Sequence, residues 1–297
     1  MHEGELTLTD ATAARLITQR FPTLADKPVR RVSAAGTVNT IIRIGDDLAA
    51  RFPRLPETRA SLETEAAAML ELVDACAVPT PVPFGIGGAA ADYSSAWAVQ
   101  TWLPGRTADH ERHTSSEPLA HDVATMIASL READVRGRSF DGRGRGGVLT
   151  DHDEWVTSCI DRSAHLLDVD RTRLLWSALR TLRRAGADVM SHRDLTPFNL
   201  LVSDDRLVGV LDGGGFGPAD RALDLVAVWH LFDAPRRRLV RERLGADEVE
   251  WYRGAAWALQ QAMGLVWYYE ESHPAMSALG LSTMRRLLSD DELAALV

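Results

Sequence analysis

The sequence predicts an α+β protein of two lobes. We expect an N-terminal lobe built on an antiparallel β-sheet with one helix, and a larger, mostly helical C-terminal lobe. Strand-like runs separated by turn residues crowd the first third of the chain, whereas apolar residues recur at helical spacing near its end. The 297 residues, 45% of them hydrophobic, suit either one large domain or two coupled lobes, and the motifs favour two lobes. The predicted lobes are residues 1–103 and 104–297.

Strand signals dominate the first of these lobes. Gly45 opens a tight hairpin turn, a helical segment follows at Arg59–Ala75, and Pro104 and Gly105 mark a break between the lobes. Near the other end of the chain, residues 251–271 repeat apolar side chains at helical spacing, which predicts a packed helix. The predicted strands of the first lobe are residues 29–32, 40–44 and 48–52.

The most informative motif lies in the second lobe. Residues 192–199 match the pattern H-R-D-L-x-x-x-N of kinase catalytic loops at every specified position. Apolar runs at 200–202 and 207–211 flank a short polar turn, so a hairpin would bring Asn199 and Asp212 to the same end. The motif reads His192-Arg193-Asp194-Leu195-Thr196-Pro197-Phe198-Asn199.

This spacing favours phosphoryl transfer, which needs a carboxylate to position the acceptor and oxygen ligands for magnesium. We expect Asp194 to be the catalytic residue, orienting the acceptor hydroxyl and taking up its proton late. Asn199 and Asp212 are the predicted Mg²⁺ ligands. ATP or GTP would be the phosphate donor. The alternative is that these polar groups only cap a turn and end a strand.

The chain resembles the aminoglycoside phosphotransferase family of antibiotic kinases, in which we include the macrolide phosphotransferases. The spacing of Asp212, Asp220 and Asp224 follows that family's metal aspartate and the segment after it, while residues 213–215 and Thr196 depart from its pattern. The resemblance implies a bilobal fold like that of protein kinases and a small-molecule hydroxyl acceptor. No A-P-E-like segment follows, so a protein substrate is not expected.

The resemblance also implies a set of nucleotide-binding residues. Arg51 stands where the family carries its third-strand cation, and Glu65 is its expected partner among Glu63, Glu65 and Glu71. Residues 33–39 would cover the phosphates, and backbone groups around residues 100–102 would meet the purine. The nucleotide-binding candidates are Arg51, Glu65, Ser33, Gly36, Gln100 and Trp102.

Composition restricts the other functions. A net charge of −9 argues against a nucleic-acid partner, and the absence of a long apolar run argues against a membrane partner. Two cysteines give no disulfide framework. Because the sequence starts with an acidic-polar segment instead of a cationic one followed by an apolar stretch, we expect a cytoplasmic protein. Residues 137–147, rich in Gly and Arg, predict a mobile surface loop that could fold over the acceptor; RNA contact is the alternative.

The acceptor-binding candidates are Asp233, Tyr269, Glu270 and Glu271, because carboxylates beside aromatic rings suit an amino sugar. The ordinary interpretation of these residues is a solvated helix end beside packed aromatics. The predicted function is Mg²⁺-dependent transfer of a nucleotide γ-phosphate to a hydroxyl of an aminoglycoside-type antibiotic. One alternative is a macrolide or metabolite O-kinase. The other is a catalytically silent nucleotide-binding module.

Overall fold

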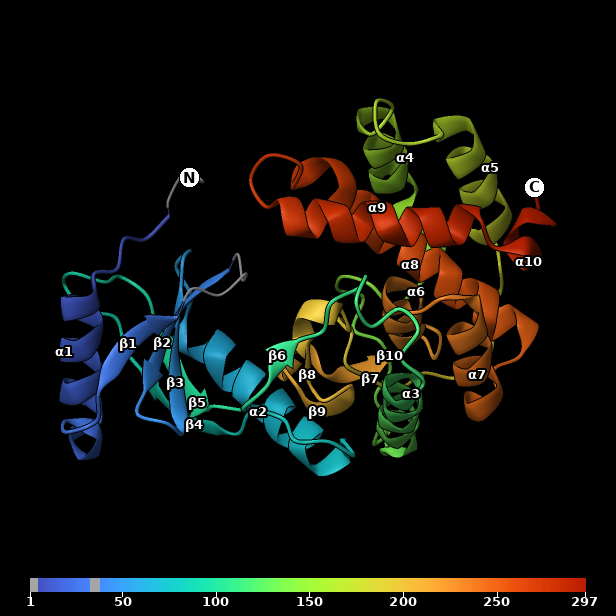
Figure 1. Ribbon diagram of the computed structural model, residues 1–297. Coiled ribbons are helices and arrows are strands. Elements are labelled where there is room, and N and C mark those ends of the chain that lie inside the picture. Colours follow the sequence, from blue (N-terminus) through green and yellow to red (C-terminus); the bar gives the residue numbers. More distant parts are fainter. Residues whose placement is uncertain (1–4, 33–37) are drawn as a thin grey trace. The chain divides into compact units, whose positions relative to one another are not determined.

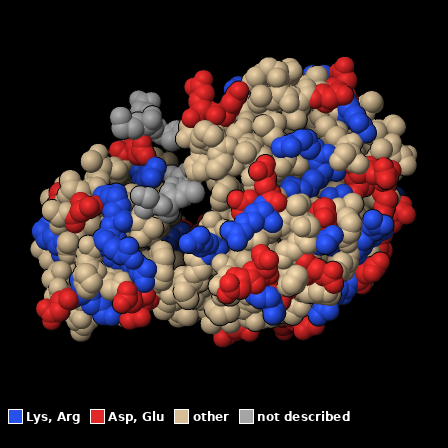
Figure 2. Space-filling view, viewed as in Figure 1, with Lys and Arg blue, Asp and Glu red and all other residues tan. Residues whose placement is uncertain are grey.

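The computed structural model describes residues 5–32 and 38–297 and divides the chain into two compact units. The first contains the described residues up to 74, then 79–104 and 209–215; the second contains 75–78, 105–208 and 216–297. Asp212 therefore packs with the first unit, although the predicted boundary at 103/104 assigned it to the second lobe. Charges of both signs are interspersed over the visible face of each unit (Figure 2).

The first unit is built on a five-stranded antiparallel sheet in the order β1-β2-β3-β5-β4. The predicted strands are present, and Gly45, with φ of +58°, lies in the turn between β2 and β3. Ile41 of β2 pairs with Arg51 of β3. The strands are β1 (Val29–Val32), β2 (Asn39–Ile44), β3 (Leu48–Pro53), β4 (Pro83–Gly87) and β5 (Trp97–Thr101).

Helices α1 (Asp10–Arg20) and α2 (Arg59–Ala75) lie on opposite faces of this sheet (Figure 1). Buried residues of α1 pack with Phe52 and Trp97, whose rings stack with centroids 4.7 Å apart. Because successive strand residues point to opposite faces, Arg51 points away from the core that contains Phe52, and its guanidinium reaches Glu65 of α2. The β-strand alternation thus places a cation on the α2 side of the sheet.

The second unit is mostly helical and also holds two small sheets, one pairing β7 with β10 and one ordered β6-β8-β9. The predicted hairpin at 200–211 is confirmed, with Asp204 and Asp205 in the left-handed region between β8 and β9. Its strands are β6 (Arg106–Thr107), β7 (Val189–Ser191), β8 (Leu200–Ser203), β9 (Arg206–Val210) and β10 (Gly217–Ala219).

Helix α8 runs through the core of this unit, which confirms the predicted helix from residue 251, but it ends at Tyr268, so predicted residues 269–271 lie in the turn that follows. Most of its residues are buried, and α9 packs along it (Figure 1). No helix in the described part of the chain is both long and apolar enough to cross a bilayer. The helices are α3 (Glu117–Glu132), α4 (Asp153–Arg162), α5 (Val169–Leu179), α6 (Val226–Leu231), α7 (Ala234–Leu244), α8 (Glu248–Tyr268), α9 (Pro274–Leu288) and α10 (Asp291–Ala294).

The close packing of α8 and α9 gives a stability prediction. A Cβ on Gly280 would lie 2.9 Å from the backbone oxygen of Ala262 and 2.9 Å from the backbone nitrogen of Val266, which cannot move aside independently. We expect Gly280→Ala to lower the free energy of unfolding by about 1–3 kcal/mol through overpacking. Gly186→Ala, where a Cβ meets nothing within 4 Å, is the control. Equal urea midpoints for both variants would contradict this account.

Candidate active site

A buried carboxylate holds the loop that carries the H-R-D motif. Asp224 is 3% exposed and accepts hydrogen bonds from the Ser191 hydroxyl (2.8 Å) and from the backbone nitrogens of His192 (3.0 Å) and Arg193 (3.3 Å). Arg193 has a φ of +71°, a conformation that costs a non-glycine residue free energy and needs such support. Asp224 therefore fixes the backbone directly before Asp194.

The Gly-rich segment, residues 137–147, is anchored to this loop. Arg193 donates to Asp141 (3.1 Å) and to the Pro218 carbonyl (2.8 Å), and its guanidinium lies 5.0 Å from the centre of the Phe140 ring. The backbone nitrogen of Phe140 donates to Asp188 (2.9 Å). The expectation of a mobile surface loop missed these contacts, because Arg and Gly composition carries no information about distant partners.

A second buried carboxylate fixes the end of the same segment. The backbone nitrogen of Asp220 donates to the Gly146 carbonyl (2.8 Å). The Asp220 side chain, 2% exposed, accepts from Arg253 Nε (2.8 Å) and Trp257 Nε1 (2.9 Å) of α8. Arg253 also donates to the Gly147 carbonyl (3.4 Å). The segment is thus tied to the core helix one residue after Arg145.

Asp194 is held from three directions. Its Oδ1 accepts from Arg145 Nη2 (2.6 Å) and Gln261 Nε2 (2.9 Å), and its Oδ2 accepts from Asn199 Nδ2 (3.2 Å). A carboxylate oxygen offers about two lone-pair positions. Among the described residues, Oδ1 is therefore saturated while Oδ2 retains one position. The Asp194 side chain is 43% exposed, so that position is accessible to a hydroxyl donor.

The hydrogen bonds around Gln261 determine a histidine tautomer. Because a carboxylate only accepts, Gln261 turns its NH₂ group toward Asp194 and its oxygen toward His230 Nε2, 3.3 Å away, which must carry the hydrogen. Burial lowers the pKa of His230 to about 3, so its unprotonated Nδ1 lies 2.7 Å from the Thr283 hydroxyl as an acceptor, in competition with the Leu279 carbonyl, 2.9 Å from the same hydroxyl oxygen. A buried series of hydrogen bonds, running from α9 through α6 and α8, thus orients the Asp194 carboxylate.

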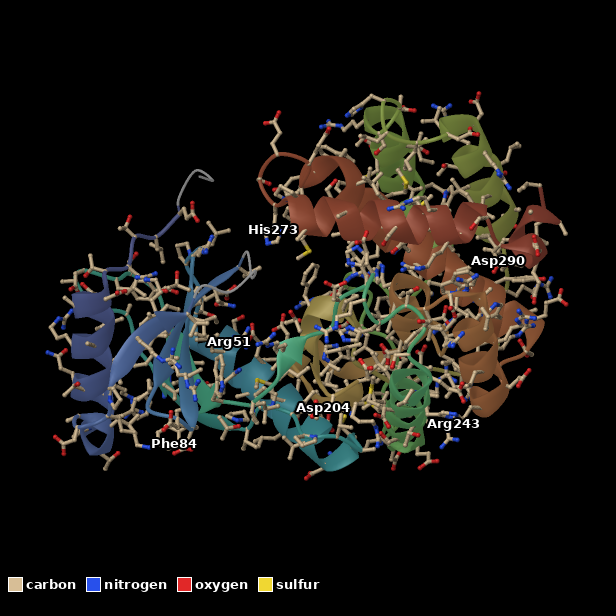
Figure 3. All side chains as sticks on the ribbon, in the orientation of Figure 1. Arg51, Phe84, Asp204, Arg243, His273 and Asp290 are labelled. Atoms are coloured by element: carbon tan, nitrogen blue, oxygen red, sulfur yellow. The ribbon has the colours of Figure 1, made fainter. Side chains whose placement is uncertain are left out.

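The first unit contributes a separate charged cluster. Arg51 lies between the sheet and α2 (Figure 3), with Nη1 3.7 Å from Glu65 and Nη2 3.1 Å from Asp212. Burial raises the pKa of Glu65; the Arg51 charge opposes that shift, and Asp212 and Glu57 add to it. The arginine thus joins two carboxylates that are distant in sequence.

The glycines after Asp212 allow this cluster to form. Asp212 itself has a φ of +61°. A Cβ on Gly213 would lie 2.3 Å from Leu72 Cδ2, and one on Gly214 would lie 3.1 Å from Glu65 Cγ. The glycines that depart from the family pattern therefore let this turn, Gly213–Gly215, approach α2 closely.

Asn199 of the second unit and Asp212 of the first each carry an oxygen of the kind that a hard divalent cation binds. Asn199 Nδ2 donates to the Asp194 carbonyl (2.8 Å) and carboxylate, which leaves Asn199 Oδ1 as the ligand atom. Asp212 uses Oδ1 for Arg51 and is 51% exposed. Mg²⁺ takes one or two protein oxygens and fills its other positions with water and phosphate. Within the described ranges no cluster of three His, Cys, Asp or Glu side chains forms a denser metal site.

The predicted acceptor residues occupy different environments. Asp233 caps α7 by accepting from the Arg236 backbone nitrogen (3.1 Å). Glu270 contacts His165 (3.0 Å), and Glu271 is exposed. The Tyr269 ring approaches His273 (6.2 Å), which in turn lies 6.3 Å from Phe198 of the motif (Figure 3). Of the four candidates, Tyr269 is the one whose contacts lead to the catalytic loop.

Some of the groups predicted to contact the purine already bond to other residues of the first unit. The Trp102 backbone nitrogen donates to the Asp47 carbonyl (2.7 Å), and Gln100 lies in β5 opposite Ala49. The Trp102 ring lies under the Arg43 guanidinium, 4.9 Å away. Because the backbone nitrogen of Trp102 is already bonded, we expect its backbone oxygen to be the group that meets the purine. Ser33 and Gly36 lie outside the described residues.

The sequence from residue 29 to residue 257 matches the phosphotransferase enzyme family. The chain belongs to that family. Two curated relatives are aminoglycoside 3'-phosphotransferases from Salmonella typhimurium and Escherichia coli, 26% and 25% identical over 165 residues. Each match covers 51% of this chain and 59% of the relative, so it spans little more than half of either protein.

Solved structures of phosphotransferases share the fold. The GDP complex of aminoglycoside 2'-phosphotransferase-IIIa aligns with a TM-score of 0.68 at 16% identity, covering 94% of this chain and 98% of that one. The macrolide 2'-phosphotransferase from Brachybacterium faecium aligns with a TM-score of 0.61 at 17% identity, covering 92% and 97%. These likenesses confirm the predicted bilobal α+β fold of a phosphotransferase.

Sequence reasoning missed three residues of this candidate site: Arg145, Gln261 and His230. The spacing of Asp220 and Asp224 is visible in the sequence, but their partners are not: Asp220 binds the Gly-rich segment, and Asp224 binds the loop before Asp194. One signal was present, since polar Gln261 lies beside Ala262 of the apolar stripe in the helix predicted at 251–271. A buried polar residue implies a hydrogen-bonding partner.

The buried histidine gives a pH prediction. Burial is the main cause of the low pKa of His230, and the positive charges of Arg286, Arg145 and His110 lower it further. The unfolded chain binds a proton at this residue below about pH 6.5, while the folded chain does not until about pH 3. Stability therefore falls as pH drops through this window, by at most about 1.4 kcal/mol per pH unit.

Urea denaturation between pH 7.5 and 5, roughly the upper part of that window, measures this predicted loss of stability. His230→Gln removes the titrating group, so its stability should fall less steeply with acid than that of the wild type. Other histidines titrate in both proteins, and the difference in slope isolates His230. Parallel pH profiles for the two proteins would show that the ring is not held neutral.

Proposed function

We propose that this protein transfers the γ-phosphoryl group of ATP or GTP to a hydroxyl group of a small-molecule antibiotic, with an aminoglycoside as the first acceptor to test. The observation that carries the proposal is the accessible Oδ2 of Asp194, on a loop held by Asp224, in a chain that belongs to the phosphotransferase family. The relatives include aminoglycoside and macrolide phosphotransferases, which supply the acceptor classes.

In the proposed reaction Asp194 Oδ2 accepts the hydrogen of the acceptor hydroxyl and orients its oxygen toward the γ-phosphorus. As the new O–P bond forms, the bond to the β-phosphate oxygen breaks and the nucleoside diphosphate leaves. The hydroxyl proton passes late to Asp194, because a carboxylate is a weak base toward an alcohol. Catalysis rests mainly on positioning and charge stabilisation.

The nucleotide would be bound through the first unit. We assign Arg51 to the α- and β-phosphates, with Glu65 restraining its guanidinium at 3.7 Å. Asn199 and Asp212 would hold Mg²⁺, which neutralises phosphate charge when bound. We expect this activity in the cytoplasm, where thiols such as Cys76 and Cys159 stay reduced.

A phosphorylation assay with purified protein tests the function. We expect phosphate transfer from radiolabelled ATP or GTP to kanamycin, gentamicin or streptomycin, which are bound in the solved structures of related phosphotransferases. A macrolide serves as the second acceptor class, because a macrolide 2'-phosphotransferase shares the fold. Nucleotide binding without transfer to any acceptor would instead favour a silent nucleotide-binding module.

Removal of the Asp194 carboxylate tests its role. We expect Asp194→Ala to lower kcat by about 10²- to 10⁴-fold, because the acceptor hydroxyl loses its orienting base, while the KM for nucleotide changes little. Asp194→Asn retains the shape of the side chain and should also be impaired. The control is Asp170→Ala, whose side chain is 89% exposed on α5. Near-normal turnover by Asp194→Ala would remove Asp194 from the mechanism.

A further inference from the structure

The cation nearest to Asp194 comes from the Gly-rich segment. Arg145 Nη2 donates to Asp194 Oδ1 at 2.6 Å, and the Arg145 side chain is 26% exposed. Within the catalytic loop the residue two positions after Asp194 is Thr196, which is neutral. The cation of the loop itself, Arg193, donates to Asp141 and to the Pro218 carbonyl, so Arg145 is the cation that contacts Asp194 among the described residues.

The backbone on both sides of Arg145 is constrained. Gly144 and Gly146 have φ values of +68° and +116°, which a larger residue would adopt only with strain. A Cβ on Gly146 would lie 2.7 Å from Ala219 Cβ, so the segment approaches β10 as closely as its glycine allows. Arg145 is thus held in place before any ligand binds, which reduces the entropy cost of its contacts.

Arg145 has unused hydrogen-bonding capacity. A guanidinium carries five N–H donors, and the described structure uses one nitrogen, Nη2. Nε is buried and has no hydrogen-bond partner among the described residues. Nη1 makes no hydrogen bond with the described residues and is not among their buried unpaired atoms. A donor of the guanidinium is therefore free to bind an anion beside Asp194.

The proposed reaction brings an anion to that place. The phosphorus becomes bonded to the same oxygen whose hydrogen faces Asp194 Oδ2, so the phosphoryl oxygens must pass beside a carboxylate. Like charges at this separation repel, and more strongly near protein than in bulk water. A positive charge already bonded to Oδ1 offsets this repulsion. Planar guanidinium groups suit this task, because they bind carboxylate and phosphate oxygens together.

We propose that Arg145 is a second catalytic residue, binding the phosphoryl group during its transfer while keeping Asp194 in place. This inference rests on the proposed function. As the O–P bond forms and the bond to the diphosphate breaks, Nη1 donates to a phosphoryl oxygen while Nη2 stays on Asp194. No proton leaves the guanidinium.

The first test is kinetic and uses the full chain with an acceptor phosphorylated by the wild type. We expect Arg145→Ala to lower kcat about 10²- to 10³-fold with little change in either KM, as for loss of a donor that acts on the transition state. Arg145→Lys should retain part of the activity, and millimolar guanidinium should partly restore Arg145→Ala but not Asp194→Ala. Arg143→Ala, two residues away in the same segment, should match the wild type.

A second test needs no acceptor. With Mg²⁺, ADP and aluminium fluoride, which imitates a transferring phosphoryl group, the wild type should melt at a higher temperature than with ADP alone. This additional shift should disappear in Arg145→Ala and persist in Arg143→Ala. Melting temperatures without ligand show whether the variants fold equally well.

The outcomes separate the two proposals. Wild-type turnover by Arg145→Ala, together with an intact fluoride-dependent shift, would overturn the catalytic role and leave the proposed function standing. A higher kcat in Arg145→Ala would also overturn it, because the arginine would then be masking Asp194. If the wild type phosphorylates no acceptor but the shift still depends on Arg145, the acceptor assignment fails and the role of Arg145 stands.

Discussion

The geometry of the loop that carries Asp194 depends on one buried carboxylate. Asp224 accepts two backbone hydrogens and one hydroxyl hydrogen from the residues that lead into Asp194. These bonds offset the cost of the left-handed conformation of Arg193. A buried carboxylate without such donors would be costly, so the loop and the aspartate stabilise each other. The position of Asp194 follows from this pairing.

A second layer of polar contacts determines the orientation of the Asp194 side chain. Gln261 presents its NH₂ group because neutral His230 donates to its oxygen. Low local dielectric strengthens such chains, but only when every member has a partner. Two donors on Oδ1 leave Oδ2 as the atom with remaining capacity. The buried network thus selects which oxygen meets a hydroxyl donor.

In the first unit, one arginine holds two carboxylates together. Arg51 contacts two carboxylates, and burial raises the pKa of one of them, Glu65. A cation shared between two acids stays in place while its remaining donors can bind phosphate. The glycines at 213 and 214 permit this arrangement, because side chains there would collide with Leu72 and Glu65. These glycines, which depart from the pattern of the family, thus allow the charged cluster to form.

The sequence by itself determined the local elements and the motif. The strands at 29–32 and 48–53, the hairpin after Asn199 and the helix at 248–268 follow from periodicity and turn residues, which act over a few positions. The packing of Asp212 with the first unit and the contacts of Arg145 and Gln261 with Asp194, 49 and 67 residues away in sequence, were decided by the tertiary structure. Hydrogen bonds between distant residues leave no periodic signal, because they depend on how the chain folds back on itself.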